Sequence, residues 1–339
     1  MLYITTRDNK DAYTAHRALH EDTAIDGGAY VPFRMPALSA EEITGLCSKN
    51  FSHTVAAVLN FFFACRLSGW DVEFCIGRKP LMLTTMTHRI VIAELWHNPE
   101  GIYSHICSSL YRKLCGDGTK CPSEWFKIAA HISVLFGIYS EMRRDNIISA
   151  SDSFDISASA DDLAVPLAAM YARQMGLPVK TIVFSTEGNS GLWDFIHLGE
   201  IGMQAVDTDS VSYERLVHAT LGCSGVSTFR NAIGARRTFR MDEDMLSQFN
   251  NGLFCSVTGK ERGIQNINSI YRSNSYIPDP MTAFSVGGLQ DYRAKTGESR
   301  LTLVLSCASP IKYLSLIADA TGISQENLSM VLKNQMDRR

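Results

Sequence analysis

Strands that alternate with helices are the feature of this sequence that most restricts its fold. From residue 153 onward, apolar runs rich in β-branched residues alternate with helical patterns that stop at glycine or proline. The pattern predicts strands over 153–159, 179–186 and 300–309, and helices over 161–176, 190–200, 279–297 and 310–322. Strands in this arrangement form a sheet between two helical layers, so we expect a three-layer α/β lobe. Ligands in such sheets bind at the carboxyl ends of the strands, which points to the loops after Ser157, Ser185 and Ser306.

The first ninety residues predict a separate, mainly helical unit. Ser39 and Glu42 have the spacing of a capping box, and a second helix is expected over 52–66. Between the central strip and the α/β pattern, residues 124–142 repeat apolar side chains at helical spacing. We therefore expect three parts: an N-terminal domain, a short middle segment and an α/β domain, with bounds 1–90, 91–122 and 123–339.

Composition and charge exclude several classes of protein. The 32 basic and 35 acidic residues give a net charge of -3, which argues against a nucleic-acid partner. The longest apolar run, residues 55–65, is too short to span a membrane, and no secretory signal opens the chain. Nine cysteines without an export signal indicate free thiols and a cytoplasmic location. The spacing of Cys107, Cys115 and Cys121 fits no zinc motif, so we expect no metal.

Residues 94–114 have the pattern of an active-site entry, in which a polar turn with a proline leads into an amphipathic helix. The helix offers Tyr103, Ser104 and His105 at its start. Ser104 and His105 could suggest a nucleophile and a base, but neighbours on a helix point about 100° apart and do not face each other. His97 could bind an anion or hold the turn before the helix, and we favour the structural role.

Several segments, in order and over most of the chain, resemble threonine synthase, a pyridoxal-phosphate lyase of fold type II. The opening segment with the run "IDGGAYVP" is similar to that family's opening. The strip "ELWHNPEGIYSH" is similar to its "ELFHGPT" region. The segments "YARQMGLPVKTIVFSTEGN", "YIPDPMTAFSVGG" and "LVLSCASPIKY" resemble later family motifs. The resemblance implies a tryptophan-synthase-β-like large lobe, a threonine-synthase N-terminal domain and conversion of O-phosphohomoserine to threonine with pyridoxal phosphate.

At the family's functional positions, however, this sequence departs from the pattern. Ser104 stands where the family has its Schiff-base lysine, and a serine hydroxyl cannot form an imine. The glycine-rich loop that would hold the cofactor phosphate is replaced by four other residues, Asp161, Asp162, Leu163 and Ala164. Cys307 stands where the family has a threonine facing the pyridine nitrogen. Only the loop 115–122 remains where the family inserts a small domain, so most of that domain is missing.

These departures favour a non-catalytic relative of the family that acts through protein interaction or small-ligand sensing. We expect no catalytic residue and no cofactor; the alternative cofactor is pyridoxal phosphate. A second copy or another protein is expected to cover the face that the missing small domain leaves. Ligand candidates in the former cleft are His97, Ser104, Asn189, Ser306 and Cys307. The alternatives are an enzyme of altered chemistry on an amino acid or phosphorylated amino acid, and a diverged threonine synthase.

Overall fold

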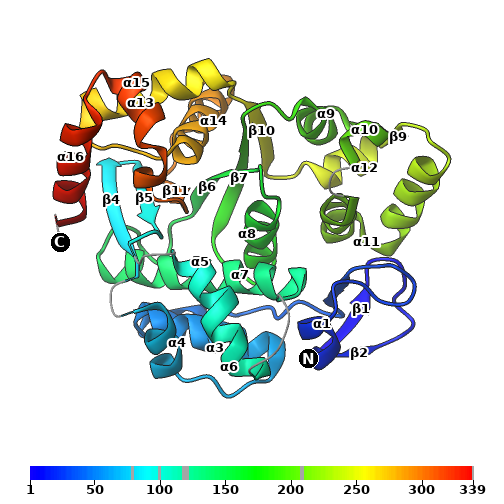
Figure 1. The fold of residues 1–339 in the computed structure, drawn as a ribbon. Coiled ribbons are helices and arrows are strands. Elements are labelled where there is room, and N and C mark those ends of the chain that lie inside the picture. Colours follow the sequence, from blue (N-terminus) through cyan, green and yellow to red (C-terminus); the bar gives the residue numbers. More distant parts are fainter. Residues whose placement is uncertain (78–79, 98–100, 117–121, 207–209, 338–339) are drawn as a thin grey trace.

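A six-stranded sheet forms the centre of the protein in a computed structural model that describes residues 1–77, 80–97, 101–116, 122–206 and 210–337. Its strand order is β10-β7-β6-β11-β5-β4, and every neighbouring pair is parallel except β4 with β5 (Figure 1). The strands are β4 (Met82–Thr87), β5 (Ile90–Glu94), β6 (Phe154–Ser159), β7 (Val179–Thr186), β10 (Leu253–Val257) and β11 (Thr302–Ser306). The carboxyl ends of five strands therefore lie along one edge.

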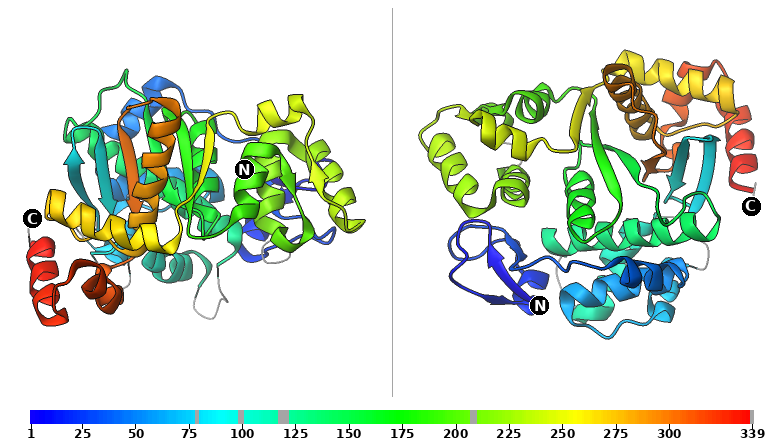
Figure 2. Two further views of the ribbon diagram at one scale, coloured as in Figure 1. Left: turned by 90° about the horizontal axis from the view of Figure 1, so that it is seen from above. Right: turned by 180° about the vertical axis from the view of Figure 1, so that it is seen from behind.

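Helices cover both faces of this sheet, as the alternating sequence pattern predicted. Helix α14 (Pro280–Thr296) packs on the face that presents Ile92, Val183 and Val304. On the other face, Ile156 and Leu305 belong to the large core that contains helices α7 (Glu124–Arg144) and α8 (Ala164–Gln174) (Figures 1 and 2). Because both faces are covered, the strands read as continuous apolar runs. The three-layer α/β fold is confirmed.

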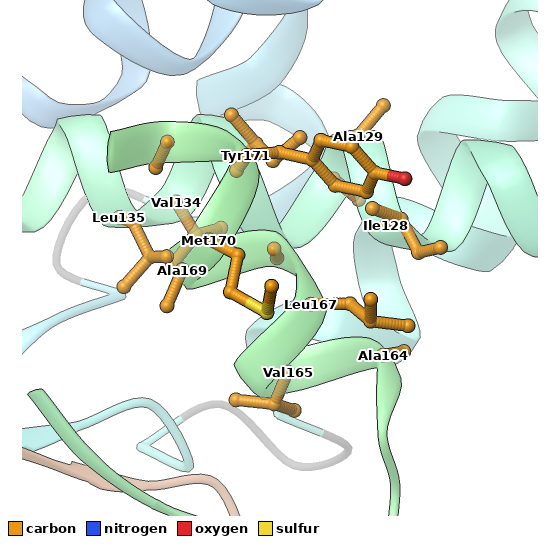
Figure 3. Packing of buried hydrophobic residues seen from close by; sticks show 14 of the residues in the cluster. Ile128, Ala129, Val134, Leu135, Ala164, Val165, Leu167, Ala169, Met170 and Tyr171 are labelled. Carbon is orange, nitrogen blue, oxygen red and sulfur yellow. The ribbon is translucent and has the colours of Figure 1, made fainter. Parts of the chain in front are cut away.

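Small side chains allow α7 and α8 to pack closely. Figure 3 shows Ala129 of α7 and Ala169 of α8 within the same cluster as Leu135, Leu167 and Met170. All five side chains are at most 1% exposed. Alanine lets the backbones approach while the larger residues fill the gaps between them, which gives the interior its density. This packing fixes the position of α8 and of the loop that precedes it.

The N-terminal part contains more strand than the sequence predicted. A three-stranded antiparallel sheet of order β2-β1-β3 precedes the helices, and consecutive residues of β1 and β3 are buried. The capping box of Ser39 and Glu42 is present at the start of α2. The elements are β1 (Leu2–Thr5), β2 (Tyr13–Thr14), α1 (Ala15–His20), β3 (Tyr30–Pro32), α2 (Ala40–Cys47), α3 (Phe51–Phe63) and α4 (Gly69–Ile76).

Two interactions tie this N-terminal part to the α/β lobe. Helix α3 packs against α7, where Gly137 leaves room for the Phe51 ring; a Cβ there would come within 2.8 Å of it. Strand β4 lies before residue 90, yet it pairs with β5 in the central sheet. The predicted domain bounds at 90 and 122 remain a prediction.

Two further groups of elements flank the sheet, at opposite ends in Figure 1. One surrounds the buried Phe195 ring, which contacts Tyr213, Phe229, Phe239 and Phe249. It comprises α9 (Ser190–Leu198), β8 (Glu200–Ile201), α10 (Met203–Val206), α11 (Ser210–Gly234), β9 (Phe239–Arg240) and α12 (Glu243–Phe249). The other comprises α13 (Lys260–Asn274), the 3-10 helix η2 (Pro310–Tyr313), α15 (Leu314–Thr321) and α16 (Gln325–Asp337). Within the described ranges, no helix combines the length and apolarity needed to cross a bilayer.

Two adjacent phenylalanines of α3 test the importance of its buried face. Phe62 is 0% exposed and packs edge-on against Trp125, whereas Phe61 is 38% exposed. We predict that Phe62→Ala lowers the free energy of unfolding by about 3–5 kcal/mol, because it leaves a cavity in a packed core. Phe61→Ala should cost less than about 1 kcal/mol. Urea unfolding followed by circular dichroism measures both, and equal losses would contradict the assigned packing.

Candidate functional site

The strip that follows β5 forms a short helix with an irregular centre. It comprises α5 (Ile102–His105), the π-helix η1 (Ile106–Leu110) and α6 (Tyr111–Cys115). Gly101 precedes it with a φ of 85°, a conformation that favours glycine. The Ile102 N–H donates to the Leu95 carbonyl at 2.9 Å, so the helix starts directly beside the end of the strand. Part of the predicted turn, including Pro99, lies outside the described residues.

The three polar residues at the start of this helix face different surroundings. Ser104 is exposed to solvent. The Tyr103 ring lies against the His131 ring of α7, with 3.7 Å between ring centroids. His105 lines a groove together with Phe74 of α4. No hydrogen bond joins Ser104 to His105 in the described part of the chain, so the strip holds no nucleophile–base pair of the kind considered from the sequence.

Tyr103 and His131 form a buried ring contact between the strip and α7. Desolvation lowers the pKa of His131 to about 4, although the carboxylate of Asp162 acts in the opposite direction. Desolvation also raises the pKa of Tyr103 well above its usual value, with further contributions from Cys307 and Cys107. Both groups are therefore neutral at pH 7. The Tyr103 hydroxyl and His131 Nδ1 have no hydrogen-bond partner in the described structure.

Two aspartates occupy the start of α8. Asp162 Oδ1 accepts a hydrogen bond from the Ala164 N–H at 2.9 Å, in the first turn of the helix. Asp161 accepts hydrogen bonds from the hydroxyls of Ser159, at 3.0 Å, and Thr186, at 3.3 Å. Leu163, between the aspartates and the helix, is buried. A helix N-terminus favours negative charge, and here the chain supplies that charge from its own side chains.

His97 makes a buried contact with Glu94 at the end of β5. Its Nε2 lies 2.7 Å from Glu94 Oε2, and the two side chains are 1% and 0% exposed. Glu94 Oε1 accepts a hydrogen bond from the Thr84 hydroxyl at 2.5 Å, which joins β4 to the end of β5. The His97 ring also stacks on Trp96. These contacts support the structural role that we favoured for His97.

A second buried carboxylate, Asp279, organises the end of β11. Its Oδ2 accepts a hydrogen bond from the Ser306 hydroxyl at 2.9 Å, and Ser306 in turn accepts one from Trp96 Nε1 at 3.1 Å. The Met281 and Thr282 N–H groups donate to its Oδ1 at the start of α14. Burial raises the pKa of Asp279 above its usual value, while these hydrogen bonds oppose the rise. The sequence did not single out Asp279, because its role depends on partners that are distant along the chain.

The five predicted ligand candidates divide into two groups. His97 and Ser306 are buried and hydrogen-bonded, and Asn189 caps α9 through the Leu192 N–H while donating to the Tyr213 hydroxyl at 3.2 Å. Ser104 and Cys307 remain exposed. Although Cys307 is exposed as a residue, protein atoms surround its thiol; this desolvation and the carboxylates of Asp279 and Asp162 raise the thiol pKa, so the thiol is protonated at pH 7.

This arrangement offers little reactive chemistry. Ser104 has no base among its described neighbours, and a protonated thiol such as Cys307 is a weak nucleophile. In the portion of the chain that the structure describes, no group of three or more His, Cys, Asp or Glu side chains is placed to hold a metal ion. The carboxylates at the sheet edge accept hydrogen bonds from the protein itself.

A groove lies beside the strip, on the side away from the sheet. It is lined by residues of α4 and of the strip, with a volume of about 710 Å³: Phe74, Cys75, His105, Ser109, Arg112, Lys113 and Gly116. The outer side of α4 is unusually apolar, since Trp70 is 69% and Phe74 88% exposed. Exposed aromatic side chains of this kind are typical of interaction sites.

Comparison with known sequences relates the chain to threonine synthases. Residues 2–78 match the family model described as the threonine synthase N terminus. Human threonine synthase-like 1 is 21% identical over 216 residues, which are 60% of this chain and 29% of that protein. The Macaca fascicularis protein of the same name is 22% identical over the same coverage. The matched region thus spans less than a third of the length of these relatives.

Comparison with solved structures gives the same fold. A threonine synthase from Brucella melitensis with pyridoxal phosphate bound aligns with a TM-score of 0.77 and 16% identity, covering 98% of this chain and 94% of that chain. The yeast threonine synthase also aligns at 0.77, with 16% identity, covering 96% of this chain and 91% of that one. The mixed sheet and its helical layers are consistent with fold type II.

The buried histidine predicts a loss of stability in acid. The folded-state pKa of His131, about 4, lies below the unfolded value of about 6.5, so the unfolded chain binds the proton first as pH falls. Stability is therefore lost between these two values, by up to about 3 kcal/mol from this group. We predict that His131→Phe removes this share, whereas the exposed control His88→Gln does not. Urea unfolding at pH 7 and pH 4.5 gives, for each variant, the free energy of unfolding that is lost between the two pH values. Equal losses for the two variants would contradict the prediction.

Proposed function

Because the chain is threonine synthase-like in its N-terminal segment and in its fold, we propose that it is a non-catalytic relative of threonine synthase. It acts by binding a small ligand or a protein partner, and it does not use pyridoxal-phosphate chemistry. The alternatives, an enzyme of altered chemistry and a diverged threonine synthase, both need an activated group at the sheet edge. No described contact at that edge activates Ser104 or Cys307.

The hydrogen bond from Ala164 to Asp162 is the observation that carries this proposal. The resemblance assigns the start of α8 to the cofactor phosphate, and an incoming phosphate would need the same first-turn N–H. It would also lie beside Asp161, whose carboxylate is held in place by Ser159 and Thr186. Two fixed negative charges repel a phosphate that carries one to two more. These residues therefore do not fit pyridoxal phosphate.

Ser104 supports the same conclusion from the other end of the site. It is exposed at the position that the resemblance assigns to the imine-forming lysine, and its hydroxyl cannot form that bond. Ser306, near the predicted ring position of Cys307, already donates to Asp279. Ser104 thus offers no imine-forming amine, and the Ser306 hydroxyl is already hydrogen-bonded within the protein.

The apolar side of α4 supports the partner-binding part of the proposal. The groove beside it ends at Gly116, next to the place where the sequence predicts the small domain to be missing. The same face carries Asp71 on α4 and Arg112 and Lys113 on α6. Asp71 and Lys113 pair within the chain, which leaves the exposed Trp70 and Phe74 as an apolar patch beside them. A two-fold arrangement would bury this patch against the same patch of another copy, so we propose a second copy of this chain as the partner.

Restoring the lysine tests the loss of the cofactor site. We predict that Ser104→Lys shows no saturable imine absorbance when it is titrated with pyridoxal phosphate, and that it releases no threonine from O-phosphohomoserine. Adding Asp161→Asn and Asp162→Asn should raise cofactor affinity by about fivefold over Ser104→Lys, because asparagine keeps the cap but removes the charge. Saturable imine formation by the parent protein, detected by borohydride trapping on a lysine, would overturn the proposal.

The molecular mass in solution tests whether a second copy of the chain is the partner. We predict that size-exclusion chromatography with light scattering gives about twice the chain mass of 37.6 kDa. Trp70→Ser combined with Phe74→Ser should shift the protein to the monomer, since the pair forms the apolar centre of the proposed interface. Met330→Ser, which changes another exposed apolar residue, at 64% exposure, should leave the mass unchanged. A parent protein that is monomeric at all concentrations would exclude a second copy as the partner.

A further inference from the structure

A small apolar pocket lies behind the former cleft, between α13, the start of α14 and the segment η2–α15. Its volume is about 240 Å³. Ten residues line it, and most are apolar: Glu187, Lys260, Gly263, Ile264, Ile267, Pro280, Met281, Phe284, Tyr313 and Leu316. Gly263 lets the Phe284 ring pack directly on α13, since a Cβ there would come within 2.2 Å of it. The side chains around the pocket are therefore closely packed, and the pocket is the space that they leave unfilled.

Two opposite charges stand at one end of this pocket. Glu187 follows β7 and Lys260 follows β10, and the pairing of these strands continues into their loops. The Gly259 N–H donates to the Glu187 carbonyl at 3.1 Å, so the two charged residues come from adjacent backbones. Both are exposed. Even so, no ion pair between them occurs within 4 Å in the described residues, and each side chain keeps its charge available.

The start of α13 adds hydrogen-bond donors at the same place. Lys260 is the first residue of this 15-residue helix, and Gly259 at the N-cap has no side chain to accept from the first turn. The Gly263 N–H bonds to the Gly259 carbonyl, which leaves earlier N–H groups of the first turn without that partner. A carboxylate placed here would meet both the Lys260 ammonium and the helix N-terminus.

We propose that this pocket binds a free α-amino acid with an apolar side chain, of the size of leucine or methionine. The carboxylate contacts Lys260 and the start of α13, the ammonium contacts Glu187, and the side chain enters the space between Ile264, Phe284 and Leu316. At about 30 Å³ for each methyl-sized group, a volume of about 240 Å³ has room for the leucine side chain. This specifies the ligand of the binding role proposed above, on which it rests.

Met281 connects the pocket to the former cleft. It lines the pocket, and its sulfur lies 3.7 Å from the Ser159 hydroxyl. Ser159 in turn donates to Asp161 at the start of α8. A ligand in the pocket therefore lies one side chain away from the position of the former phosphate loop, although it uses none of the residues there.

Calorimetric titration of the full chain with single amino acids tests the proposal. We expect saturable binding of leucine and methionine. Serine, N-acetyl-leucine and leucinamide should bind at least tenfold more weakly, because they lack the apolar group, the ammonium and the carboxylate respectively. Glu187→Gln and Lys260→Gln should each weaken leucine binding by about tenfold or more. The matched controls Glu298→Gln and Lys295→Gln, on the exposed end of α14 and the residues after it, should leave it unchanged.

A variant that fills the pocket tests whether leucine binds there and not elsewhere on the surface. Leu316→Trp puts a larger side chain into a half-buried position of the lining. It should abolish leucine binding, while the midpoint of thermal unfolding stays within a few degrees of that of the parent protein. Absence of leucine binding in the parent, or equal binding of leucinamide, would overturn the proposal. Cofactor imine formation is read separately by absorbance, so its appearance would overturn the proposed function and leave a positive leucine titration standing.

Discussion

The contact between α7 and α8 is the interaction on which the rest of the structure depends. Helix α7 is buried along most of its length between α3 on one side and α8 on the other, so it joins the N-terminal part to the sheet layers. Its small residues, such as Ala129, let α8 approach closely. That approach sets where α8 begins, and with it the position of Asp162. The position of Asp162 at the sheet edge therefore depends on the packing of α7 against α8.

At the ends of β5 and β11, two buried carboxylates are hydrogen-bonded within the chain. Glu94 pairs with His97, and Asp279 accepts from Ser306 and from two backbone N–H groups. A buried carboxylate is stable only when such partners are present. A binding edge normally leaves some of these groups for its ligand. Here the protein uses the carboxylates of Glu94 and Asp279 to join β4, β5, β11 and α14.

Local patterns predicted the elements whose side chains decide their own conformation. The strand ending at Ser159 and the capping box at Ser39 were both evident, since each depends on residues that are close in sequence. The β4–β5 pair, the π-helix at Ile106–Leu110 and the strand Leu253–Val257 were not predicted. Their conformations depend on neighbours from distant segments, which a local pattern does not contain. The same limit hid Asp279, while the resemblance located Asp162 but not its bond to the helix.

The carboxylate on α8 has a consequence for how the protein responds to its surroundings. A ligand that caps a helix stabilises a protein more as its free concentration rises, so stability then depends on the supply of that ligand. Asp162 lies two residues from the N–H that it accepts from, and its effective concentration there does not change with the contents of the cell. The start of α8 thus receives its negative charge from within the chain, and this contribution to stability does not vary with the concentration of a small anion.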